Sequence, residues 1–292
     1  MLKALKKYRA PYLFIMPFFI LFLVFQLVPT IWTFYISLTN WKGIGTPDFC
    51  EFDNYRKMLI DDMFWESLGN TVVYWLTALV FIICCALLIA SLLNSRYLKS
   101  NSARAFFKTA TFLPNICAAI AMGLIFRMLF DENVGLVNEL VTMLGGSRLP
   151  WLTSTTFSKI PVIILNVWRY TPWFTMILLS GLLNISKDYY EAATVDGANG
   201  WQQFWFITLP SLKNILFFCS VTLTVDMWKL FNESYILPGP GTSNSSLFQY
   251  MYESGFNVFN MGYASAIGVI LILILIVISI IQFVVRHKQG EI

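Results

Sequence analysis

The stretch Thr71-Val-Val-Tyr-Trp-Leu-Thr-Ala-Leu-Val-Phe-Ile-Ile-Cys-Cys-Ala-Leu-Leu-Ile-Ala-Ser-Leu-Leu93 contains no charged residue. A helix of about 20 apolar residues is long enough to cross the hydrocarbon core of a bilayer, which is about 30 Å thick. We therefore predict a transmembrane helix over residues 71–93.

Similar apolar runs recur along the whole chain, which is 57% hydrophobic and only 12% charged. A soluble domain of this length would need more surface charge to stay dispersed. We predict an all-α, polytopic membrane protein with six transmembrane helices, at residues 12–36, 71–93, 112–130, 160–183, 212–230 and 264–285.

Composition argues against several other classes of protein. The net charge is +4, but the basic residues cluster beside apolar runs, where they indicate membrane topology and not nucleic-acid binding. The five cysteines form no CxxC pair and have no histidine cluster nearby, so no disulfide framework or zinc site follows. The single histidine, His287, leaves histidine-based catalysis in the membrane without a candidate.

The distribution of Lys and Arg predicts the orientation, because basic residues are retained on the cytoplasmic side. Basic residues gather before the first span, in the segment 94–111 and in the tail. In the segments on the opposite side of the membrane, acidic residues offset the basic ones. We expect a multi-pass protein of the cell (inner or plasma) membrane with both termini in the cytoplasm. Cys50 and Ser147 should face outward, and Ser102 and Ser186 inward.

Prolines interrupt several of the expected spans. Pro17, Pro29, Pro114, Pro161 and Pro172 each remove a backbone donor. Such breaks persist in a bilayer where neighbouring protein or a water-filled cavity satisfies the freed carbonyl groups. We expect kinked helices, which favour a transporter interior over a simple anchor.

The segment 184–211, between the fourth and fifth expected spans, should form two short helices that meet at a turn. Ser186 or Asp188 can cap the first helix, and Gly197 can end it in the left-handed conformation. Asn199 can cap the second helix, and Pro210 marks the bend into the fifth span.

The first of these helices carries Glu191, Ala192 and Ala193, a compact patch that lets another protein's backbone approach closely. We interpret it as a docking surface. The alternative is an amphipathic loop that rests on lipid headgroups, but Lys187 is the only basic residue in the segment, and such loops are usually rich in Lys and Arg.

Glu191-Ala192-Ala193, Gly197 and Ile207-x-Leu209-Pro210 together resemble the EAA motif of type I ABC importer permeases. Asp196 and Ala198 match the form found in the carbohydrate-uptake branch, which includes maltose-type and glycerol-phosphate-type subunits. The six-span plan, Ser37-Leu38-Thr39 and Gly262-Tyr263-Ala264-x-Ala266 extend the resemblance over nearly the whole chain. It departs at Phe231-Asn232 and at Leu237-Pro238-Gly239-Pro240-Gly241, where the family has other residues.

The resemblance implies that the segment 184–211 inserts into a cleft of a separate cytoplasmic ABC ATPase. The implied ATPase-coupling residues are Glu191, Ala192, Ala193, Asp196, Gly197, Ala198, Ile207, Leu209 and Pro210. It also implies a second, homologous permease subunit and an extracytoplasmic solute-binding protein. The chain contains no Gly-Lys dipeptide and so no GxxxxGK[ST] phosphate-binding loop, which places ATP and magnesium on the partner and no cofactor on this chain.

This plan divides the chain into three parts. Residues 1–68 hold the first helix and an outward loop, residues 69–285 the permease core with the coupling loop at 184–211, and residues 286–292 a cytoplasmic tail.

Polar residues inside expected spans are costly and usually face a bundle interior or an aqueous path. Depth along the helices places Arg169 and Asp226 within reach of each other, so we expect them to pair, with direct solute contact as the alternative. The candidate translocation path comprises Arg169, Trp173, Asp226, Trp228, Lys229 and Asn232.

The predicted function is translocation by alternating access, with a sugar or short oligosaccharide as the cargo and no covalent chemistry on this chain. Within the same family, glycerol phosphate or a polyamine is the alternative cargo, and Arg169 with Asp226 does not decide between an anion and a cation. An ion-driven secondary transporter would leave the docking motif unexplained. An integral-membrane enzyme would need convergent catalytic groups that the sequence does not show.

Overall fold

The computed structural model describes residues 9–95 and 100–288, which divide into two compact units. Unit 1 comprises the chain up to Asp61 together with Met251–Ile274, and unit 2 comprises Asp62–Tyr250 together with the chain from Leu275 onward. Within the described ranges the regular secondary structure is helical, apart from an isolated β-bridge between Thr39 and Phe49. The predicted all-α class is confirmed.

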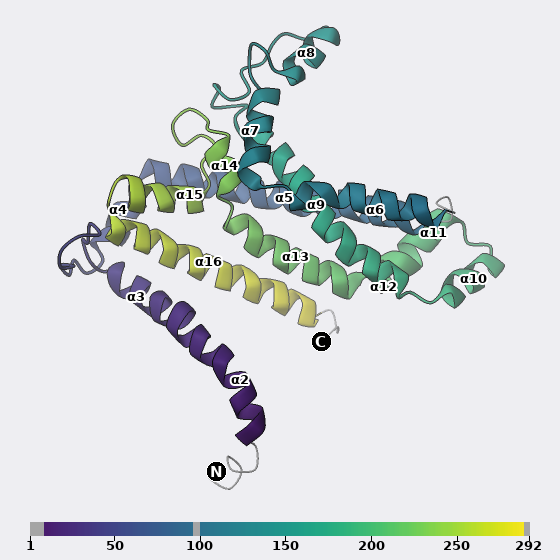
Figure 1. Cartoon of the computed structure of the whole chain (residues 1–292), viewed down its shortest axis with the longest axis horizontal. Helices are drawn as coiled ribbons and strands as arrows, with labels where there is room; N and C mark the ends of the chain where they lie inside the picture. Colours follow the sequence, from purple (N-terminus) through teal and green to yellow (C-terminus); the bar gives the residue numbers. More distant parts are fainter. Residues whose placement is uncertain (1–8, 96–99, 289–292) are drawn as a thin grey trace. The chain divides into compact units, whose positions relative to one another are not determined.

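Figure 1 shows the α-helices in their order along the chain. Three π-helical turns lie among them in the described residues. Their bounds are α2 (Arg9–Phe22), η1 (Leu23–Leu27), α3 (Val28–Ile36), α4 (Asp53–Leu59), α5 (Asp62–Asn94), α6 (Asn101–Ile116), α7 (Ala119–Leu129), α8 (Leu136–Met143), α9 (Lys159–Leu183), α10 (Lys187–Val195), α11 (Gly200–Gln203), η2 (Phe204–Thr208), α12 (Leu209–Ser211), α13 (Lys213–Trp228), α14 (Asn232–Ile236), α15 (Leu247–Tyr252), η3 (Glu253–Asn257) and α16 (Met261–Lys288).

Four stretches of helix in the described residues are long and apolar enough to cross a membrane: Pro11–Ile36, Asp62–Asn94, Lys159–Leu183 and Met261–His287. They coincide with the first, second, fourth and sixth expected spans. The third expected span falls on a bent helix pair and the fifth on the second half of another, and the number of candidate spans in the described residues reaches six if each pair is one span.

The span predicted at residues 112–130, with Pro114 inside it, is a sharply bent pair of helices. Ala105–Ile116 and Ala119–Leu129 meet at 92°. The break lies at Cys117 and Ala118, whose ψ angles of 141° and 128° are extended. Pro114 precedes the break by one turn, and its missing N–H removes a helical hydrogen bond there. A second bend, of 66°, separates Gly200–Ser211 of the coupling segment from Lys213–Trp228 of the fifth span, close to Pro210, where a bend was expected.

Two of the π-helical turns end just before a proline. Turn η1 is followed by Pro29, and η2 by Pro210. A proline ring clashes with the carbonyl four residues earlier and cannot donate to it, so the preceding turn widens to i→i+5 bonding. The expected distortion by proline is therefore confirmed at these two positions.

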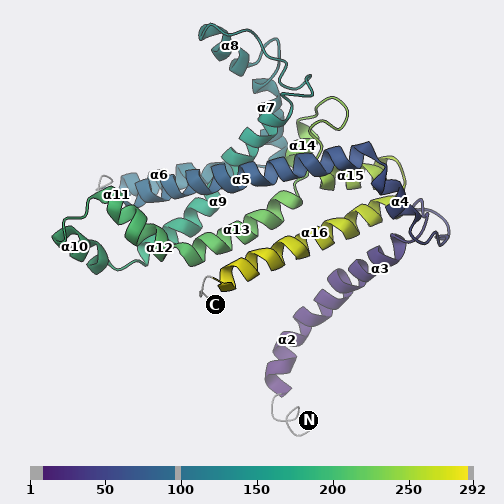
Figure 2. The ribbon, with the colours of Figure 1, turned by 180° about the vertical axis from the view of Figure 1, so that it is seen from behind.

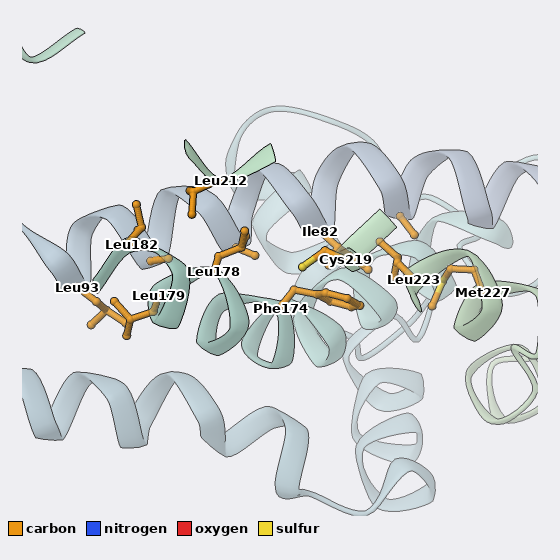
Figure 3. Packing of buried hydrophobic residues seen from close by; sticks show 13 residues of the cluster. Ile82, Leu93, Phe174, Leu178, Leu179, Leu182, Leu212, Cys219, Leu223 and Met227 are labelled. Atoms are coloured by element: carbon orange, nitrogen blue, oxygen red, sulfur yellow. The ribbon is translucent and has the colours of Figure 1, made fainter. Parts of the chain in front are cut away.

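The core of unit 2 forms where α5 packs along α9 and α13 (Figure 3). Buried residues recur on α5 at every fourth position, Ala78, Ile82, Ala86 and Ala90. The small alanine side chains allow the helix backbones to approach closely, which is the usual means of packing helices in a bilayer. Other faces of α5 expose large apolar side chains such as Leu88, 63% exposed, as fits a helix surrounded by hydrocarbon.

The segment between α14 and α15 is bound to the first turns of α5. Asn70 Nδ2 donates to the carbonyl oxygens of Thr242 (2.8 Å) and Ser245 (3.0 Å), and the Tyr74 hydroxyl donates to that of Asn244 (2.7 Å). These buried backbone groups thus find side-chain partners in place of regular secondary structure. Figure 2, seen from behind, shows this region and the α10–α12 region at opposite ends of α5.

Unit 1 brings two motifs of the sequence together. Asn54 Nδ2 donates to the carbonyl oxygens of Ser37 (2.9 Å) and Thr39 (2.8 Å). The N–H of Gly262 donates to the Trp41 carbonyl (3.0 Å), and a Cβ on Gly262 would lie 1.9 Å from the Thr39 oxygen. The glycine therefore permits a direct contact between the start of α16 and the turn that follows α3.

Candidate functional site

The coupling segment folds locally as its sequence predicts. Ser186 caps α10, with its hydroxyl accepting from the Asp188 N–H (3.3 Å). Gly197 has φ +84° and ends the helix in the left-handed conformation, while the Ala198 N–H donates to the Ala193 carbonyl (2.8 Å). Asn199 begins α11 in a capping box with Gln202. Of the two predicted capping residues, Ser186 and Asp188, the serine caps the helix.

Side-chain hydrogen bonds hold α10 against α11 and η2. The Tyr190 and Thr208 hydroxyls lie 2.9 Å apart. Gln203 Nε2 donates to Thr194 Oγ1 (2.9 Å) and to the Ala198 carbonyl (3.3 Å). Sequence reasoning missed these four side chains, because they are ordinary polar residues whose roles depend on the angle between two short helices. The coupling segment is thus a folded helical hairpin, not an extended loop.

Helix α10 lies between two grooves. One, of about 540 Å³, is lined by Tyr189, Ala192, Ala193, Asp196, Phe206, Ile207, Pro210 and Ser211. The other, of about 710 Å³, is lined by Asn94, Ser95, Leu182, Leu183, Ile185, Lys187, Tyr190, Glu191, Thr194 and Gln203. Most of the predicted coupling residues line the first groove, Glu191 lines the second and more polar one, and Gly197, Ala198 and Leu209 line neither.

Large apolar side chains on this segment are exposed. The exposed fractions are 62% for Tyr189, 88% for Val195, 70% for Trp201 and 79% for Phe206. Clustered apolar exposure of this kind marks an interaction surface. Of the predicted coupling residues, Glu191, Ala192, Asp196, Gly197 and Pro210 are exposed, and Ala193, Ala198, Ile207 and Leu209 are half-buried.

The expected pairing of Arg169 with Asp226 is wrong. Arg169 forms an ion pair with Glu233, whose side chain is 3% exposed, and the Arg169 Cζ lies 5.5 Å from the centre of the Tyr170 ring. Asp226 forms no ion pair with Arg169 in the described part of the chain. The depth of a residue counted along its span could not distinguish Glu233 from Asp226 as the partner, because α13 ends at Trp228 and the chain turns back into α14. This turn carries Glu233 to Arg169.

Several polar atoms on α9 and α13 are buried without a partner among the described residues. They include both amide atoms of Asn166, Nε of Arg169 and Nε1 of Trp228. Trp228 is 2% exposed and packs against the Trp75 ring at 6.1 Å. Buried polar atoms without partners are uncommon in proteins and invite water or ligand. Asn166, one turn before Arg169, was not among the predicted site residues.

Trp173 lines a groove between α6, α9 and α13. The groove has a volume of about 610 Å³ and is almost entirely apolar, with Phe112, Met176, Ile177, Ser180, Asn214, Ile215 and Phe218 as its other walls. Lys229 and Asn232 are exposed beyond the end of α13. Of the candidate path residues, Trp173 therefore lines the groove, Arg169 forms the ion pair and Trp228 is buried on α13.

The structure does not bring the two predicted sites together. Arg169 lies about 21 Å before the end of α9, counted at 1.5 Å per residue, and α10 follows that end. A change at one site must therefore pass along helices to reach the other. The described residues hold no group of three or more His, Cys, Asp and Glu side chains that could bind a metal ion.

Several known proteins are similar in sequence to this chain over nearly its whole length. The Bacillus subtilis arabinooligosaccharides transport system permease protein AraP is 36% identical, over 98% of this chain and 91% of that protein. The lactose transport system permease protein LacF of Rhizobium radiobacter is 31% identical, over 95% and 94%. The trehalose/maltose transport system permease protein MalF of Thermococcus litoralis is 30% identical, over 98% and 97%.

The fold is also that of a solved transporter chain. A bacterial alginate ABC transporter, crystallised with an alginate pentasaccharide-bound periplasmic protein, superposes with a TM-score of 0.86 over 99% of this chain and 98% of that one, at 23% identity. The family model of the binding-protein-dependent transport system inner membrane component matches residues 1–290. The chain therefore belongs to this family of multi-pass transport permeases.

Proposed function

We propose that this permease subunit imports a sugar or short oligosaccharide by alternating access. The observation that carries the proposal is the set of relatives at 30–36% identity over nearly the full chain, whose names specify arabinooligosaccharides, lactose and trehalose or maltose. Trp173 on the wall of the apolar groove supports it, because a sugar's C–H faces pack well on aromatic rings.

The energy for transport comes from ATP and magnesium on a separate cytoplasmic ATPase, which docks on α10–α12. Two grooves flank α10 and exposed apolar side chains surround it, so the hairpin presents a ridge that a cleft in a partner can hold. Glu191 supplies a charge on one side of the ridge, and Ala192 and Ala193 a shallow surface on the other. This chain itself binds no cofactor.

The solute path runs along the groove of α6, α9 and α13 toward the Arg169–Glu233 pair. Asn166, Arg169 and Trp228 offer buried hydrogen-bonding atoms that the described protein leaves unpaired, which suits hydroxyl groups of a sugar. Trp173, Asp226, Lys229 and Asn232 complete the proposed path. A second, homologous permease provides the facing wall.

The basic clusters orient the subunit with both termini and α10 in the cytoplasm. The segment 131–158 and the region of α14 and α15 then face outward, where an extracytoplasmic solute-binding protein delivers the cargo. The exposed apolar faces of α2, η1 and α3 contact membrane lipid.

The coupling assignment is tested with Glu191→Lys and Gly197→Asp. Each variant should insert into the membrane but fail to retain the ATPase and to support uptake, because each places the wrong charge or backbone geometry on the ridge. Gly145→Asp is the matched control, since Gly145 has φ +86° against +84° for Gly197 and both have open space around them. Uptake at the wild-type rate by both test variants would refute the assignment of α10–α12 as the ATPase docking site.

The cargo is tested by uptake of radiolabelled arabinooligosaccharides, lactose, maltose, glycerol phosphate and a polyamine into proteoliposomes that contain the complete transporter. ATP-dependent uptake of one or more of the sugars is expected. Uptake of glycerol phosphate or the polyamine alone would replace the sugar proposal with the corresponding alternative cargo.

A further inference from the structure

Arg286 connects the end of α16 to the first turn of α13. It lies in the last turn of its helix and is only 7% exposed. Its Nη1 donates to the carbonyl oxygen of Lys213 (3.1 Å), and its Nη2 donates to Oδ1 of Asn214. A buried guanidinium that binds both backbone and side chain of one turn fixes the position of that turn.

Aromatic rings and a second polar contact extend the connection. The Arg286 Cζ lies 4.5 Å from the centre of the Phe217 ring, and Phe217 meets Phe283 of α16 edge to face at 5.2 Å. One turn before Arg286, Gln282 Nε2 donates to Thr224 Oγ1 (3.0 Å). The last two turns of α16 are thus bound to α13 at its start and again further along it.

This connection lies directly after the coupling segment. The chain turns by 66° between Ser211 and Lys213, and Lys213 is the first residue of α13 after that bend. The coupling segment joins α9 at one end and α13 at the other, and a displacement of α10–α12 that passes along the chain into α13 arrives first at the turn that Arg286 holds.

We infer that Arg286 is a positioning residue of the transport cycle, which fixes the first turn of α13 to α16 so that the two helices move together when the coupling segment is displaced. The inference rests on the proposed role of α10–α12 as the ATPase docking site. Arginine suits the task because its planar fork can bind a carbonyl and an amide while its face stacks on a ring; lysine offers a single point charge.

The test measures the separation of α13 and α16 in the complete transporter. Nitroxide labels are placed at Phe218→Cys and Val285→Cys, both exposed positions, with the five native cysteines replaced by alanine. Pulsed electron paramagnetic resonance then gives the distance distribution without nucleotide and after trapping with MgATP and vanadate. The labelled protein with Arg286 intact should give one narrow distance distribution, which is the same without nucleotide and after trapping.

Arg286→Ala and Arg286→Lys should keep the narrow distribution without nucleotide and acquire a second, longer distance after trapping. Control His287→Ala removes an exposed basic side chain from the same turn and should behave as wild type. A purely stabilising role predicts less folded protein, with distributions that do not depend on nucleotide. Arg286→Lys retains the charge, so it provides the result if Arg286→Ala fails to fold.

A nucleotide-independent distribution in both Arg286 variants, or a shift on trapping with Arg286 intact, would overturn the inference. Retention of the ATPase subunit is measured on the same samples. Retention by Glu191→Lys, measured in parallel with Arg286 intact, would indicate failure of the proposed docking site, which is a separate outcome from failure of the helix connection.

Discussion

The ion pair between Arg169 and Glu233 stabilises the junction between α9 and α14. The loss of folding free energy on removing one charge can be estimated from the burial of the two side chains. The Glu233 side chain is 3% exposed and that of Arg169 is 20% exposed. Removing one partner of a buried pair costs about 3–5 kcal/mol, because the other charge remains without compensation. We expect about 3 kcal/mol for Glu233→Gln, which leaves Arg169 with some access to solvent, and at least as much for Arg169→Ala, which leaves the buried Glu233 carboxylate alone.

The double variant Arg169→Ala with Glu233→Gln should recover most of that loss. Independent effects would sum to about 6 kcal/mol, whereas removal of both charges should leave a loss of about 1–2 kcal/mol from the missing hydrogen bond and packing. The measurement is unfolding in mixed micelles of mild detergent and SDS, followed by tryptophan fluorescence on all four members of the cycle.

A parallel cycle of Arg169→Ala with Asp226→Asn serves as the control. Asp226 forms no ion pair with Arg169 in the described structure, so its coupling should be much smaller. Additive losses in the Arg169–Glu233 cycle, or an equally strong recovery in the control cycle, would refute the assignment. If the stable double variant retains the ATPase but not uptake, the pair also belongs to the solute path.

Three further predictions concern other parts of the chain. Gly262→Ala should destabilise the protein by about 1–3 kcal/mol or more in a thermal unfolding assay, because the new methyl group would lie 1.9 Å from the Thr39 carbonyl oxygen; an unchanged midpoint would contradict this contact. In a cysteine-free background, Ser147→Cys should react with an impermeant maleimide from outside and Ser186→Cys only from the cytoplasm, and the reverse pattern would invert the topology. Burial, with a smaller contribution from a nearby carboxylate, raises the pKa of the Cys50 thiol, so its labelling rate should rise at a higher pH than that of Ser147→Cys, and coincident pH profiles would contradict the raised pKa.

The coupling segment shows how far local sequence can go. Ser186, Gly197 and Asn199 each act on backbone groups within a few residues, so their capping roles are readable from the order of residues alone. The grooves beside α10 are different, because Asn94 and Leu182 reach one of them from the ends of α5 and α9. No local pattern contains that information.

The ion pair shows the limit from the other side. Hydropathy and burial cost indicate that Arg169 needs a partner, and this requirement follows from residue type and position in a span. The choice of Glu233 over Asp226 depends on the turn after Trp228 and on α14, which the apolar pattern does not describe. Gly262 is similar, since its motif was visible but its contact with the turn after α3 was not.

The sequence by itself determined the membrane class, the approximate spans and the caps of the coupling helices, because hydrocarbon thickness, backbone hydrogen bonding and glycine conformation act over short stretches of chain. Only the tertiary structure decided the 92° break between α6 and α7, the partner of Arg169 and the connection of Arg286 to α13. These depend on which helices meet and at what depth. Contacts between residues 64 or 73 positions apart are set by packing of whole helices, which residue types along one segment do not specify.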